Sequence, residues 1–80
     1  MGKLKNYLRA KDYINKYVWV YTYNNTGGKV LLFSNKAKIL NSTLGFTFLD
    51  CEVSNVETSY LSDNEFNKCD EIDIIINYRG

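Results

Sequence analysis

The chain has 80 residues, enough for a single domain spanning 1–80, and its 45% hydrophobic and 15% aromatic content excludes a disordered chain. It has no histidine, which excludes imidazole-based catalysis, and no apolar run near the roughly 20 residues that a membrane crossing needs. The net charge of +1 conceals an asymmetry, because residues 1–38 carry eight basic side chains and one acid, whereas residues 39–80 carry eight acids and two bases.

A short amphipathic helix within residues 3–16 is the first element that the sequence predicts. Apolar side chains recur there at helical spacing, with basic and amide side chains between them. These apolar residues are Leu4, Tyr7, Leu8 and Ile14. We expect the helix to end between residues 10 and 15 and to pack on a sheet.

A β-hairpin is predicted next. In YVWVYTY, residues 17–23, four large rings alternate with β-branched side chains, which is the period of a strand with two different faces. The polar segment 24–28 contains Gly27-Gly28, whose access to positive φ suits a chain reversal. KVLLFS, residues 29–34, then forms the partner strand.

The face that carries the four rings has two interpretations. In the first, the N-terminal helix covers the rings through Leu4, Leu8 and Ile14, because four exposed rings would make a large apolar patch. In the second, the rings meet a partner. One or two rings near the hairpin tip, Tyr21 or Tyr23, are expected to stay exposed, as candidates for an interface hot spot.

The middle of the chain predicts a brief strand at 37–40, a turn at 41–43 and a longer strand at 44–53. In LGFTFLDCEV, residues 44–53, Phe46 and Phe48 fall on one side of an extended chain. This strand is expected to bend and continue toward residue 60.

The last strand is predicted at residues 71–78, after a polar connector at 61–70. One face of this strand carries alternating apolar side chains, namely Ile72, Ile74, Ile76 and Tyr78. Ile75 makes the centre apolar on the other face as well, which suits a central or barrel-closing strand. The whole layout depends on residues 17–34, 44–53 and 71–78 being extended.

The sequence therefore predicts an α+β fold, mostly antiparallel β, with the short N-terminal helix packed on a four- to five-stranded twisted sheet or a small barrel. Two short motifs favour the barrel, namely Asp63-Asn64-Glu65 and Glu71-Ile72-Asp73-Ile74. Through these motifs, residues 48–75 resemble part of the small Sm-like or SH3-like barrel proteins of Gram-positive bacteria and their phages. The resemblance covers about a third of the chain. It implies a small barrel and no particular chemistry.

Several kinds of active site are excluded by missing residues. Gly27-Gly28-Lys29 lacks the earlier glycine of a phosphate-binding loop. Residues 63–74 begin like a calcium loop, but Lys68 and Ile74 stand where that loop needs glycine and glutamate. Two cysteines are too few for a zinc site. We predict that the protein is not an enzyme and has no catalytic residue, no metal site and no cofactor.

The first function that we consider is occupation of a host protein or nucleoprotein complex by a small phage or mobile-element protein, as anti-CRISPR inhibitors do. Eight acids within residues 50–73 favour this function, because they could imitate the phosphates of a nucleic acid. The residues predicted to bind the partner are Asp50, Glu52, Asp63, Glu65, Asp70, Glu71, Tyr21 and Tyr23. The alternative is that the acidic and basic halves pair within the fold.

Two further functions stay open. In an RNA- or single-strand-binding barrel, the rings would stack on bases while basic side chains neutralise phosphates. The rings are Tyr17, Trp19, Tyr21 and Tyr23, and the basic residues are Lys3, Lys5, Arg9 and Lys11. In a self-associating structural subunit, the isoleucine-rich last strand would pair between copies at a sheet edge. The start of the chain lacks the apolar middle of a signal peptide, so we expect a cytoplasmic protein without membrane contact.

Overall fold

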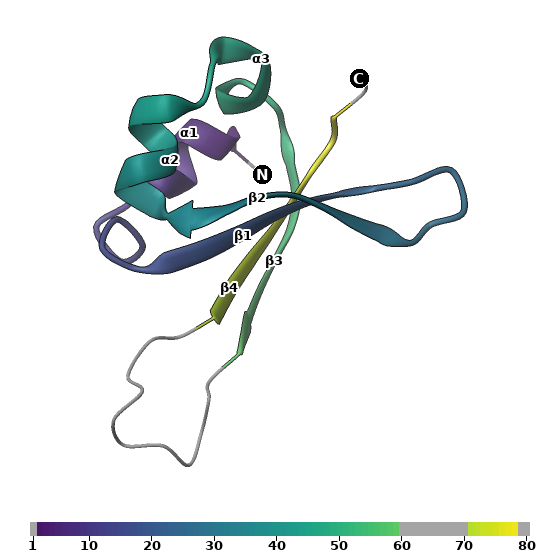
Figure 1. The fold of residues 1–80 in the computed structure, drawn as a ribbon, viewed down its shortest axis with the longest axis horizontal. Helices are drawn as coiled ribbons and strands as arrows, with labels where there is room; N and C mark the ends of the chain where they lie inside the picture. The colour runs from purple at the N-terminus through teal and green to yellow at the C-terminus, as the bar shows by residue number, and fades with distance from the viewer. Residues whose placement is uncertain (1, 60–70, 79–80) are drawn as a thin grey trace.

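The computed structural model describes residues 2–59 and 71–78, which form a four-stranded sheet with three short helices on one side (Figure 1). The strands are β1 (Tyr17–Tyr23), β2 (Lys29–Lys36), β3 (Val53–Ser59) and β4 (Glu71–Ile76), and the helices are α1 (Leu4–Leu8), α2 (Ala37–Thr43) and α3 (Phe46–Leu49). The predicted α+β class is confirmed. Across the described residues the sheet stays open, so the predicted barrel is not the architecture that this chain adopts.

The β1–β2 hairpin is confirmed, and its second strand extends to Lys36, beyond the predicted end. The reversal uses Gly27 at a φ of 86°, a conformation that glycine adopts without steric cost. Asn24 stabilises the turn, since its Oδ1 accepts hydrogen bonds from the backbone N–H groups of Thr26 at 3.0 Å and Gly28 at 2.8 Å. In Figure 1 this end of the hairpin projects from the body of the molecule.

The sheet has the order β2-β1-β4-β3, which makes β4 a central strand as predicted. β4 pairs antiparallel with β3 and parallel with β1, so that Val18 lies beside Ile72 and Val20 beside Ile74. The prediction of mostly antiparallel pairing therefore holds for two of the three pairs.

The predicted strand at residues 37–40 is wrong, because this segment begins α2. Ala37 and Leu40 are buried on one side of that helix, at helical spacing. The predicted turn at 41–43 forms its last turn, where the hydroxyls of Ser42 and Thr43 donate to the carbonyl oxygen of Ile39 at 2.9 and 2.8 Å. Both hydroxyls therefore bond within the helix itself.

The predicted strand at residues 44–53 is also wrong, since α3 occupies its middle. Gly45 precedes the helix, and its carbonyl oxygen accepts from the N–H of Leu49 at 3.0 Å. In a strand Phe46 and Phe48 would share a face, whereas here Phe46 is 79% exposed and Phe48 packs against Phe33 with ring centroids 4.7 Å apart. The extended chain begins only at Val53, and the predicted continuation beyond it forms β3.

The helices are short throughout the described part of the chain. α1 ends at Leu8, before the predicted range, and turns follow it up to β1. α2, with seven residues, is the longest helix, and none of the three has the length or apolar character that a membrane crossing requires.

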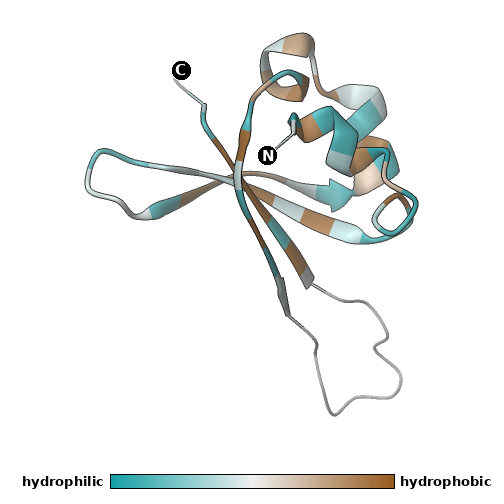
Figure 2. Cartoon of the chain, turned by 180° about the vertical axis from the view of Figure 1, so that it is seen from behind, coloured by the Kyte–Doolittle hydropathy of each residue, from teal (hydrophilic) through white to brown (hydrophobic). Residues whose placement is uncertain are grey.

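The core lies between the helices and one face of the sheet, which we call the covered face (Figure 2). Leu4 and Leu8 of α1 pack there against Val18 and Val20, and not against the rings of β1 as the first interpretation predicted. The helices cover this face because its apolar surface continues without interruption across the neighbouring strands. On the covered face the neighbouring strands continue the apolar surface with Phe33, Val56, Ile72, Ile74 and Ile76. On the opposite face charged side chains interrupt it, and an apolar helix cannot cover charges without a large desolvation penalty.

Candidate functional site

The rings of β1 lie on the side of the sheet away from the helices, which we call the open face. Side chains alternate along a strand, so the burial of Val18 and Val20 directs Tyr17, Trp19 and Tyr21 to the other side. Across the sheet the open face includes Tyr17 beside Lys36, Trp19 between Ser34 and Asp73, Tyr21 between Leu31 and Ile75, and Tyr23 beside Lys29. Rings and charges therefore share one surface.

The rings of the open face differ in exposure. Tyr17 and Tyr23, at the two ends of β1, are 37% and 47% exposed, whereas Trp19 and Tyr21 are half-buried. Tyr17 and Trp19 contact each other, with ring centroids 4.7 Å apart and planes inclined by 49°. None of the helices described here lies over this pair, because all of them pack on the covered face.

The Tyr17 end of the open face is basic. Lys36 lies directly opposite Tyr17 in the hairpin, and Lys38 follows it in the first turn of α2. Two backbone hydrogen bonds hold the loop before β1 against this segment, from the N–H of Ala37 to the oxygen of Lys16 at 2.9 Å and from the N–H of Lys38 to the oxygen of Ile14 at 3.1 Å. Lys16 of that loop, Lys36 and Lys38 form what we call the basic corner.

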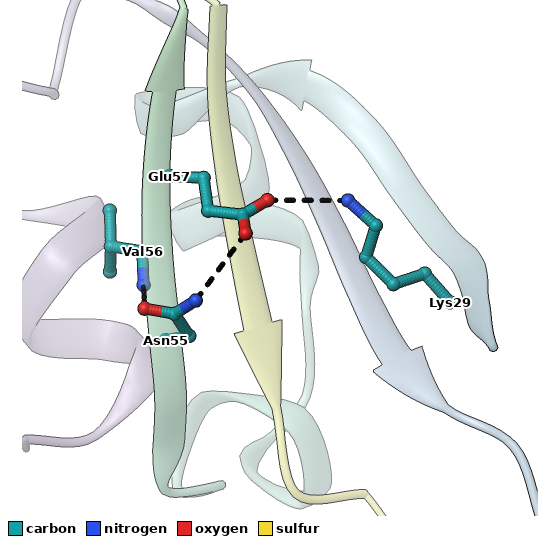
Figure 3. Close-up of polar contacts among 4 residues, drawn as sticks. All are labelled: Lys29, Asn55, Val56 and Glu57. Carbon is teal, nitrogen blue, oxygen red and sulfur yellow. Dashed lines mark hydrogen bonds and ion pairs between the residues drawn. The ribbon is translucent and has the colours of Figure 1, made fainter. Parts of the chain in front are cut away.

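The other half of the open face is crossed by an ion pair (Figure 3). Lys29 Nζ of β2 lies 3.3 Å from Glu57 Oε1 of β3 and 5.0 Å from the centroid of the Tyr21 ring. The hydrogen bond to Glu57, and next the charge of Glu57, raise the pKa of Lys29 above its ordinary value of 10.5, and Asp73 adds to this. Lysine charge in this half is therefore balanced by carboxylates.

The residues predicted to bind a host partner do not form one site. Asp50 and Glu52 lie beside α1, where Asp50 Oδ1 is 3.1 Å from Lys5 Nζ and Glu52 forms a β-bridge with Lys3. Tyr21 lies on the open face together with Tyr23. Of the remaining predicted residues, Asp63, Glu65 and Asp70 lie outside the described residues, and Glu71 opens β4.

The charge asymmetry of the sequence is partly internal. Two ion pairs within the described ranges, Lys5–Asp50 and Lys29–Glu57, each join a base of the first half to an acid of the second. This confirms, for these four residues, the interpretation that the halves pair within the fold.

Two of the residues predicted to bind phosphate do not lie beside the rings. Lys5 is paired with Asp50, and Arg9 Nε donates to Asn41 Oδ1 at 2.9 Å, so both serve contacts on the helical side of the molecule. Lys36, which the sequence analysis missed, lies next to the rings instead. The position of Lys36 could have been predicted from the hairpin. When the pairing of the two strands is continued from the turn toward the start of β1, residue 36 comes to lie opposite residue 17.

A shallow pocket of about 410 Å³ lies on the helical side, between α1 and the loop that follows it. Tyr7 and Tyr13 stack in its wall with centroids 6.3 Å apart, and Asp12 is the one carboxylate among its described lining residues. Within the described ranges, no group of three acids or cysteines is placed to hold a metal ion. This pocket therefore brings together no set of groups that defines a chemical step.

Comparisons with protein-family models, with curated proteins and with solved structures find no match for this chain. Function is therefore inferred from the arrangement of its own residues, above all from the rings and charges of the open face.

Proposed function

We propose that the protein is a non-enzymatic binding module whose open face binds single-stranded nucleic acid. The observation that carries this proposal is the row of aromatic rings on β1, left uncovered by the helices and ending at the basic corner. Single-strand-binding proteins without strong sequence preference combine the same two features, aromatic rings that stack on bases and a basic surface that follows the backbone.

The Tyr17–Trp19 pair is the stacking centre of the proposed site. The two rings contact each other, with centroids 4.7 Å apart, and so offer one continuous aromatic surface to bases that have been drawn out of their own stack. Each base stacked on an aromatic ring contributes about 1–3 kcal/mol, so two rings are sufficient for a measurable interaction with a short oligonucleotide.

The basic corner supplies the attraction for phosphate. Lys36 is adjacent to Tyr17, and Lys38 is exposed, so a strand that stacks on the ring pair would pass its backbone close to these lysines. Binding should therefore weaken as salt rises, with a slope of about −0.7 for each phosphate contacted in a plot of log affinity against log salt.

Trp19 offers a direct test because it is the only tryptophan in the chain. We expect oligo-dT and oligo-U of about 12 nucleotides to quench its fluorescence at low salt, since stacked bases quench indole emission. Fluorescence anisotropy of a labelled oligonucleotide then measures affinity, for which we expect Trp19→Ala to cause a loss of at least fivefold, the lower limit for one stacked base.

Phe46→Ala is the matched control, because Phe46 is also an exposed ring but lies in α3 on the helical side. It should bind as the unaltered protein does. Lys36→Gln should reduce both the affinity at low salt and the salt slope. Absence of quenching at low salt, or equal effects of Trp19→Ala and Phe46→Ala, would contradict the proposal.

A second candidate is the protein inhibitor of anti-CRISPR type. It is supported by the acids of residues 50–73 and by the exposed apolar side chains of the projecting hairpin end, where Tyr23 is 47% and Leu31 49% exposed. Its partner would be a host protein or nucleoprotein complex.

The two candidates respond oppositely to charge reversal. Changing Asp63, Glu65, Asp70 and Glu71 to lysine should abolish capture of a host partner if the acids imitate phosphate, and should strengthen oligonucleotide binding if the open face is the site. Self-association through the last strand required that strand to lie at a sheet edge. β4 lies between β1 and β3 and offers no edge, so we do not propose this function.

A further inference from the structure

The Lys29–Glu57 ion pair connects the two outer strands of the sheet. Lys29 begins β2 and Glu57 belongs to β3, while β1 and β4 lie between them. The side chains therefore reach over the open face and across two strands to meet at 3.3 Å, as Figure 3 shows. Such a bridge occupies surface that a ligand of the open face would otherwise use.

Glu57 is held in place for this contact. Its second carboxylate oxygen, Oε2, accepts from Asn55 Nδ2 at 3.5 Å, and Asn55 Oδ1 in turn accepts from the backbone N–H of Val56 at 3.0 Å. The carboxylate is thus oriented by its own strand toward Lys29 (Figure 3).

The bridge covers one ring of the row, Tyr21, while Tyr23 beyond it stays 47% exposed. Lys29 Nζ lies over the Tyr21 ring, and Ile75, the register neighbour of Tyr21, has no exposed surface although it lies on the open face. At the other end, Tyr17 remains 37% exposed beside Lys36. The ring of Tyr21, covered by a lysine whose charge is neutralised, therefore separates the accessible Tyr17–Trp19 pair from Tyr23 at the hairpin end.

We infer that Glu57 sets the length of the single-strand site, by holding Lys29 over Tyr21 and so confining bound nucleotides to Tyr17 and Trp19. The inference rests on the proposed function of the open face. When the charge of Glu57 is removed, Lys29 becomes available to a phosphate and the Tyr21 ring to a further base. The site then extends along β1 toward the hairpin end.

Glu57→Gln tests this inference, because it removes the charge and keeps the shape of the side chain. With an oligo-dT series of increasing length, the affinity of the unaltered protein should level off once two rings are occupied, and that of Glu57→Gln should continue to rise. The gain at full length should be about fivefold or more, the equivalent of one additional stacked base. The salt slope should become steeper by about 0.7, for one additional phosphate.

Glu52→Gln is the matched control, since it removes the same charge from an exposed glutamate that lies beside Lys3 and not beside Lys29. Equal affinity, length dependence and salt slope for Glu57→Gln and Glu52→Gln would overturn the inference, while Trp19 quenching in the same samples would leave the proposed function standing. If no variant quenches Trp19 at low salt, both fall. In the double variant Lys29→Gln/Glu57→Gln, the added salt slope should disappear, which assigns it to Lys29.

Discussion

The two faces of the sheet are built from the same strands and differ in what interrupts their apolar residues. On the covered face, Val18, Val20, Ile72 and Ile74 meet without a charged neighbour, and helices exclude water from them. On the open face the large rings alternate across the sheet with lysines and carboxylates, and water takes the place of helices. Apolar content alone therefore does not decide which face becomes the core; the continuity of the apolar surface across neighbouring strands does.

Ile74→Ala is the change with the largest expected effect. Ile74 has no exposed surface and lies in the centre of the covered face, between Val20 and Val56. Removing its side chain leaves a cavity under the helices, and we expect a loss of about 4 kcal/mol in the free energy of unfolding, measured by urea denaturation. A loss below about 1 kcal/mol would mean that the covered face is not the core.

Ile75→Ala asks whether the open face contributes to stability. Ile75 is as buried as Ile74 but has rings and an ion pair above it, which can collapse into the space more readily than a packed helix. We expect a loss of about 2 kcal/mol by the same urea assay, at the lower end for this kind of truncation. Equal losses for the two isoleucines would show that both faces are equally rigid.

Leu31→Ser tests whether an exposed apolar side chain of the open face contributes to stability. Leu31 is 49% exposed on the open face, beside Tyr21. Because so much of its side chain is already in water, the free energy of unfolding should change by no more than about 0.5 kcal/mol. A larger loss would indicate that this residue is buried against something in solution, and sedimentation of the same variant would show whether that is a second copy.

The smallest effect is expected for the reactivity of Cys51, a half-buried thiol that follows α3. Burial, and then the negative charge of Asp50, raise the pKa of this thiol, which donates to the Thr47 oxygen at 3.0 Å. In a Cys69→Ser variant, alkylation of Cys51 at pH 8 should be slower than in the same protein unfolded in urea, because less thiolate is present. Equal alkylation rates would contradict the packing described for this residue.

The raised pKa of Cys51 also makes stability depend on pH. The protonated thiol stabilises the fold below its unfolded pKa, and this contribution is lost as the pH rises through the higher folded pKa.

The parts of the fold that could be predicted were those with long, unambiguous patterns. The alternation in residues 17–23 with the glycine turn after it, and the isoleucine run in 71–76, each specify a strand within their own segment. α2 and α3 could not be predicted because they have seven and four residues, too few for a helical period to be distinguished from alternation. Phe46 and Phe48 satisfied a two-residue period while belonging to a helix.

The candidate site was predictable in its residues but not in its orientation. Both sides of β1 carry large apolar groups, so the sequence of β1 does not say which side the helices cover. That is decided by Ile72 and Ile74 on one side of β4 and Asp73 on the other, and therefore by a parallel register with a distant strand. The Lys29–Glu57 contact depends in addition on the order of all four strands.

The pairing of β1 with β4 has a consequence for synthesis of the protein. Val18 meets Ile72, a residue made 54 positions later, so the sheet cannot assemble until nearly the whole of this chain has left the ribosome. Until then β1 presents its rings and its valines to solvent at the same time, and only its hairpin with β2 can form early. Nascent chains halted before β4 should accordingly be the species that chaperones capture and that aggregate most readily.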